Sequence, residues 1–144
     1  MPRIAVPAGA LALCASLALA ACGGGDDDKP TKAEYIAKAD AVCKTADEKI
    51  QADAQKEFGN QQPTPAQITK YQKEKVIPAL EQQSDDLRGL DKPEGDEDEL
   101  NALYDSLDKA IEGAKTAPTI DDQTFADANK KADAYGFKEC GSGN

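Results

Sequence analysis

The sequence predicts an all-α protein built as a small antiparallel bundle of about four helices. Apolar residues after Thr31 recur every three to four positions in four separate segments, which is the spacing of amphipathic helices. Each segment has recognisable start or stop residues, and no run of alternating β-branched residues follows Thr31. Short connections between such segments favour antiparallel neighbours, so the four helices are expected to form a bundle.

The first 21 residues have the layout of an export signal. Arg3 carries the positive charge, the apolar run Ile4 to Ala21 follows, and the next residues are glycine and aspartate. The run ends in Leu19-Ala20-Ala21-Cys22, which resembles the bacterial lipobox of an aliphatic residue, two small residues and a cysteine. In lipoproteins with this pattern the peptide is cut before the cysteine, whose thiol accepts a diacylglyceryl group. The resemblance implies a lipoprotein signal peptide over 1–21 and lipidation of Cys22.

Lipidation of Cys22 implies a protein anchored on the extracytoplasmic face of the cell membrane, because two or more acyl chains hold a protein stably on a bilayer. Ordinary signal cleavage near Ala20 is the alternative, and it would leave Cys22 as an unpaired thiol outside the cell. Residues 22–31 are too polar and too rich in glycine to fold, so they are expected to form a tether with solvated aspartates. The helical domain is expected over 32–144.

The first two helices have clear local signals. Thr31 and Glu34 have the spacing of a capping box at the start of the first helix, which Gly59 is placed to end. The second helix is expected to begin at Thr64 and to close at Arg88-Gly89-Leu90 in the manner of a Schellman turn. Pro78 falls inside its pattern and must kink or restart the helix, because proline has no N–H and its ring clashes with the preceding turn.

The third helix begins in the acidic run Glu94 to Glu99 and has the most regular apolar stripe. This run lacks the alternating ligand positions of an EF-hand loop, so its charges are expected to stabilise the N-terminus of the helix instead of binding calcium. The fourth helix is expected from about Asp122 to Tyr135, with Gly136 as its stop.

Cys43 and Cys140 are expected to form a disulfide. Outside the membrane, two cysteines in a small domain favour a bridge. Zinc would need four Cys or His ligands, and the chain has no histidine. Because the fourth helix is short, its tail is expected to stop near the level of Cys43, which would leave Tyr35 and Ile36 less covered.

Each predicted helix carries one tyrosine, and the four are Tyr35, Tyr71, Tyr104 and Tyr135. A ligand pocket ringed by phenols is one interpretation. Tyrosines at the edge of the core with hydroxyl groups in contact with water are the commoner arrangement, and this is the expectation here.

Three segments together resemble a group of small actinobacterial lipoproteins. The segments are "YIAKADAVCKTADEKI", "VIPAL" with a leucine-rich acidic helix after it, and "YGFKECG". Members of that group are short exported chains with a lipobox, a helical body and one cysteine near each end, and their function is not characterised. The resemblance implies Cys22 as the lipid site and a bridge between Cys43 and Cys140, and it brings no catalytic or binding residues.

Composition narrows the possible functions. With 27 Asp and Glu against 17 Lys and Arg, the net charge of -10 disfavours nucleic acid as a partner. The chain has no histidine, no Gly-x-Ser-x-Gly elbow and no phosphate-binding loop, so neither an enzyme nor a cofactor is expected. The sequence therefore favours a non-enzymatic module that binds an envelope protein or the cell wall. The alternative is a lipoprotein that binds a small ligand or a cation in the bundle interior or at its acidic ends.

Overall fold

The computed structural model describes residues 29–121 and 123–141. These residues form helices joined by short turns and contain no strand, so the predicted all-α class is confirmed. The signal peptide, the lipid site Cys22 and most of the tether lie outside the described residues. The elements in order are α1 (Lys32–Phe58), α2 (Pro65–Tyr71), the π-helical turn η1 (Gln72–Val76), α3 (Ile77–Arg88), α4 (Glu97–Thr116) and α5 (Ala126–Tyr135).

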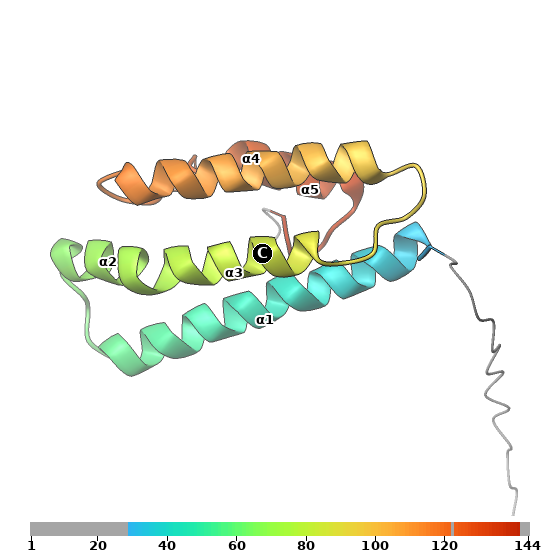
Figure 1. Ribbon diagram of the computed structural model, residues 1–144. Coiled ribbons are helices and arrows are strands. Elements are labelled where there is room, and N and C mark those ends of the chain that lie inside the picture. Colours follow the sequence, from blue (N-terminus) through green and yellow to red (C-terminus); the bar gives the residue numbers. More distant parts are fainter. Residues whose placement is uncertain (1–28, 122, 142–144) are drawn as a thin grey trace, which may run out of the picture.

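The helices form an antiparallel bundle. Figure 1 shows three rows, in which α1, the continuous run α2–η1–α3, and α4 lie side by side in alternating directions. The short helix α5 packs against α4, and α3 contacts both α1 and α4. With α2, η1 and α3 counted as one rod, the described residues form the four-helix arrangement that the sequence predicts.

The second rod is joined from pieces around Pro78, as predicted. Pro78 stands in the first turn of α3, directly after η1. At the end of η1 the Ile77 N–H bonds to the Gln72 carbonyl, which is the wider i to i−5 pattern of a π turn. This wider turn shifts the hydrogen-bond register immediately before the proline, so the chain remains helical where a regular α-helix would break.

The predicted start signals of α1 and α2 are confirmed. The Thr31 hydroxyl accepts the Glu34 N–H, and the Glu34 carboxylate accepts the Thr31 N–H at 2.9 Å. Thr64 and Gln67 form the same reciprocal cap on α2. Each box satisfies backbone donors that the first turn of a helix leaves open.

The fourth helix begins at Ala126, four residues later than predicted. The Asp121 carboxylate accepts the N–H groups of Gln123 and Thr124, each at 3.1 Å. An aspartate that bonds the backbone two and three residues ahead stabilises a turn in competition with a helix. The helix predicted from the apolar spacing after Asp121 was therefore longer than the observed α5.

The Cys43–Cys140 disulfide is present, with an S–S distance of 2.01 Å and a Cα–Cα distance of 5.2 Å. The chain reverses at Gly136, whose φ of 110° favours glycine, and residues 137–141 run back to the bridge. The Asp40 carboxylate accepts the N–H groups of Lys138 and Glu139, each at 3.0 Å. We call residues 137–141 the C-terminal tail.

The prediction that the first turns of α1 would be less covered is wrong. Tyr35 is completely buried, and Tyr135 and Phe137 pack against its ring with centroid distances of 6.2 Å each. The helix α5 itself reaches the level of Tyr35, and the tail then turns back towards Cys43. The tail therefore reaches the disulfide from the end of α1 that carries Tyr35. As a result, α5 and the tail cover Tyr35, which lies inside the aromatic part of the core.

Candidate functional site

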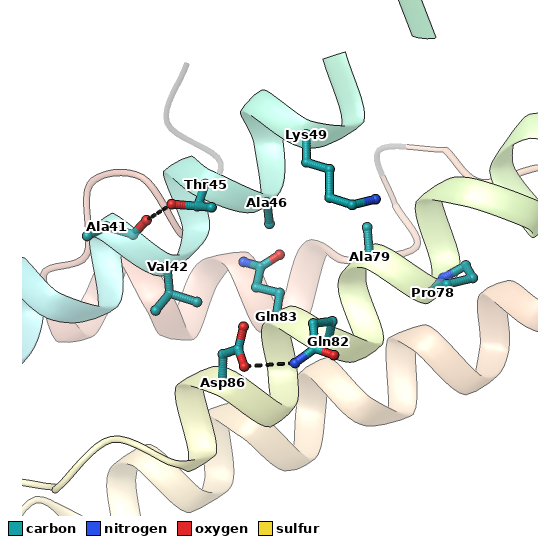
Figure 2. Close-up of a pocket in the computed structure, with 10 residues that line it drawn as sticks. All are labelled: Ala41, Val42, Thr45, Ala46, Lys49, Pro78, Ala79, Gln82, Gln83 and Asp86. Atoms are coloured by element: carbon teal, nitrogen blue, oxygen red, sulfur yellow. Dashed lines mark hydrogen bonds between the residues drawn. The ribbon is translucent and has the colours of Figure 1, made fainter. Parts of the chain in front are cut away.

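An open groove lies between α1 and α3. It has a volume of about 550 Å³. Figure 2 shows its lining, which α1 and α3 supply in equal parts. The residues are Ala41, Val42, Thr45, Ala46 and Lys49 from α1, and Pro78, Ala79, Gln82, Gln83 and Asp86 from α3.

The groove exists because the facing side chains are small and one side of α1 is uncovered. Alanines at 41, 46 and 79 leave space that larger side chains would fill. The buried residues of α1 are Tyr35, Ala39 and Cys43, all in its first half. The second half of α1 packs only partly against the rest of the bundle, so this region offers surface for another molecule.

The polar groups of the groove have partners within the protein, and three of them bond within their own helices. The Thr45 hydroxyl donates to the Ala41 carbonyl at 2.8 Å, and the Gln82 amide donates to Asp86 at 2.8 Å (Figure 2). Lys49 pairs with Asp53 at 3.1 Å, and this hydrogen bond lowers the pKa of that carboxyl group. Gln83 donates across the groove to Cys43 Sγ at 2.9 Å. With these groups bonded, the apolar floor is free to bind an apolar surface.

A second cavity of about 210 Å³, partly open to solvent, lies between α3, α4, α5 and the C-terminal tail, and we call it the interior cavity. Leu87 and Leu103, which are buried, and Leu107 and Phe125, which are half-buried, form its walls. Asp47 and Glu139 are the two exposed members of the lining. Burial, and secondarily the charge of Glu139, raise the pKa of Asp47 above its ordinary value.

On the acidic face between α3 and α4, four carboxylates pair with two basic side chains. Arg88 bonds to Asp105 at 3.0 Å and to Asp108 at 2.5 Å. Lys115 pairs with Glu81 at 2.7 Å, and also with Glu112. Within residues 29–121 and 123–141, no group of three or more His, Cys, Asp or Glu side chains could hold a metal ion.

The structure brings three of the four tyrosines together, and we call Tyr35, Tyr104 and Tyr135 the tyrosine cluster. The expectation of wet hydroxyl groups is wrong for all three. The hydroxyl groups of Tyr35 and Tyr104 bond to each other inside the core, and that of Tyr135 donates to Asp96 at 2.6 Å. Tyr71 lies apart and donates to the Ile50 carbonyl. The rings fill the core, so they do not surround a pocket.

The disulfide cysteines are the predicted site residues that the structure locates. Cys43 and Cys140 are joined, whereas Cys22 lies outside the described residues. The sequence interpretation missed the groove and the acidic mouth of the interior cavity. No repeated pattern in the sequence indicates the groove, because α3 contributes one alanine, Ala79, to its lining. Asp47 and Glu139 are 92 positions apart, and only the fold brings them to one cavity.

No protein-family model, curated protein or solved structure matches this chain. In the part of the chain that the structure describes, no helix is both long and apolar enough to cross a membrane.

Proposed function

We propose that this chain is an exported lipoprotein of the cell envelope whose helical domain is non-enzymatic and binds a partner protein in the α1/α3 groove. The observation that carries the proposal is the apolar groove beside the middle of α1, at the point where the buried residues of that helix end. The lipobox-like sequence ending at Cys22 supports an anchor on the extracytoplasmic face of the membrane.

The shape and charge of the groove favour an amphipathic helix as the occupant. From Pro78 to Asp86 the groove follows α3 for about 12 Å, or two helical turns, at ~1.5 Å per residue. Lys49 stands at the Pro78 end and Asp86 near the other end (Figure 2). A helix with an apolar stripe, an acidic residue towards Lys49 and a basic residue towards Asp86 complements this surface.

Site-specific photo-crosslinking in native membranes tests the partner. A photoreactive side chain at Ala41 or Gln82 should capture one defined protein, because both positions are exposed and line the groove. The matched control is Gln51, an exposed residue of α1 outside the groove. Equal capture of the same protein from Gln51, or no capture from either groove position, would overturn the assignment of the groove.

A charge variant separates specific docking from proximity. Ala41→Arg places a long side chain across the groove and should reduce capture through Gln82 at least tenfold, whereas Gln51→Arg should leave it unchanged.

The lipid anchor is tested separately. Metabolic labelling with palmitate should mark the wild type, and Cys22→Ala should lose the label. Failure of the label would overturn the anchor without affecting the crosslinking result.

Binding of a small ligand is the second candidate function. The interior cavity favours it, since leucine and phenylalanine side chains line much of a partly open space that is larger than one water requires. The groove and the cavity are adjacent and share the side chain of Gln83, but they are distinct spaces, so the two candidate functions do not exclude each other.

A further inference from the structure

The interior cavity has an apolar body. Leu80, Leu87, Leu103, Leu107, Phe125 and Phe137 line it from α3, α4, the turn before α5 and the tail. An enclosed apolar cavity of about 150 Å³ can bind benzene. This cavity has about 210 Å³ and is partly open, with polar side chains beside its apolar ones. Its size therefore fits one aromatic ring, or an aliphatic group of similar bulk, with a short substituent.

The mouth of the cavity is acidic. Asp47 projects from α1 and Glu139 from the tail, and both are exposed. Neither carboxylate forms an ion pair or a side-chain hydrogen bond with another residue in the described ranges. Burial and the charge of Glu139 raise the pKa of Asp47, and no basic group lowers that pKa. A positive charge between the two carboxylates would relieve their repulsion.

We propose that the interior cavity binds a small organic cation in which an ammonium group carries an apolar body of about one ring. The apolar body fills the space between α3, α4 and α5, and the ammonium group lies at the mouth between Asp47 and Glu139. Hydrophobic burial supplies affinity, and the paired carboxylates select the charge. This inference extends the second candidate function and does not require a partner in the α1/α3 groove.

Three probes with the same ring and different charges test it. Benzylammonium, benzyl alcohol and benzoate are titrated by calorimetry into the full oxidised chain in lipid nanodiscs, with empty nanodiscs as the blank. Benzylammonium should bind about five- to tenfold more tightly than benzyl alcohol, because two partly exposed ion pairs add modestly to the affinity. Benzoate should bind more weakly than the alcohol. Equal affinities of the cation and the alcohol, or no binding of any probe, would overturn the proposal.

Variants locate the site. Asp47→Asn should remove much of the preference for the cation, whereas Glu48→Gln, which removes the neighbouring charge on α1 outside the cavity, should retain it. Ala128→Leu should abolish binding of all three probes by filling the cavity. If that variant does not fold, methyl NMR of the wild type decides the location. Benzylammonium should shift the resonances of Leu103 and Leu107, and a response confined to other leucines would contradict the assignment.

Discussion

Breaking the Cys43–Cys140 disulfide is expected to lower the free energy of unfolding by roughly 4–5 kcal/mol. The bridge joins residues 97 positions apart and so closes a loop that includes most of the folded chain. In the chain-entropy model, a cross-link of this span stabilises by about 4.7 kcal/mol because it restricts the unfolded ensemble. A small domain is commonly stable by only about 5–15 kcal/mol, so this bridge is a large part of its stability.

Other contacts hold the tail in the folded state when the bridge is open. Phe137 is buried in the aromatic part of the core, and Asp40 accepts two backbone N–H groups of the tail. These contacts do not involve either sulfur atom. The reduced protein at low temperature should therefore retain its helices, and most of the lost stability should come from a less restricted unfolded state.

Thermal unfolding followed by circular dichroism measures this effect. For a domain of this size, reduction should lower the Tm by roughly 15–20 °C, since 1 kcal/mol corresponds to about 4 °C. The Tm of the double variant Cys43→Ala/Cys140→Ala should be slightly lower still, because position 43 is buried and loss of its sulfur atom would leave a small void. A reduction in Tm of less than about 5 °C in the reduced wild type would refute the loop-closure reasoning.

Two further predictions concern alkaline pH and the glycine turns. Burial raises the pKa of all three members of the tyrosine cluster above the ordinary value of 10. Above pH 10 the unfolded chain releases phenolic protons that the folded chain retains, so stability should fall by up to about 1.4 kcal/mol per pH unit for each tyrosine. Urea unfolding between about pH 9 and 11.5 measures the slope, which Tyr104→Phe should reduce by about a third; a flat profile contradicts the argument. Gly136→Ala should cost about 1–3 kcal/mol at a φ of 110°, whereas Gly89→Ala, at a φ of -73°, should be neutral or stabilising by up to about 1 kcal/mol. Equal losses in the two variants, measured by chemical unfolding, would contradict the conformational explanation.

The sequence predicted the features that depend on neighbouring residues. Thr31 with Glu34, and Thr64 with Gln67, cap their helices through contacts three positions apart, so spacing alone identifies them. Pro78 acts on its own helix through its missing N–H. The disulfide joins residues far apart in the sequence, but only two cysteines follow Cys22, so they had only each other as partners within the folded domain.

Features that depend on the direction of the chain between helices could not be predicted in this way. Gly89 was expected in a Schellman turn, but its φ of -73° shows that the chain leaves α3 without a left-handed residue. The covering of Tyr35 depends on how the tail turns at Gly136, about a hundred residues away in the chain. The hydroxyl partners of the tyrosine cluster lie on α1 and α4 and just before α4, far away in the sequence, and helical periodicity does not reveal them.

The groove and the interior cavity share one wall. Gln83 lines both spaces, and its side-chain amide donates to Cys43 Sγ at 2.9 Å. Cys43 in turn is held to the tail by the disulfide, and the tail carries Glu139 at the cavity mouth. The bridge therefore fixes the position of the side chain between the two spaces as well as that of one carboxylate at the mouth. The disulfide therefore contributes to the geometry of the groove and of the interior cavity as well as to stability. Both spaces lie beside Cys43, the α1 residue that the disulfide holds.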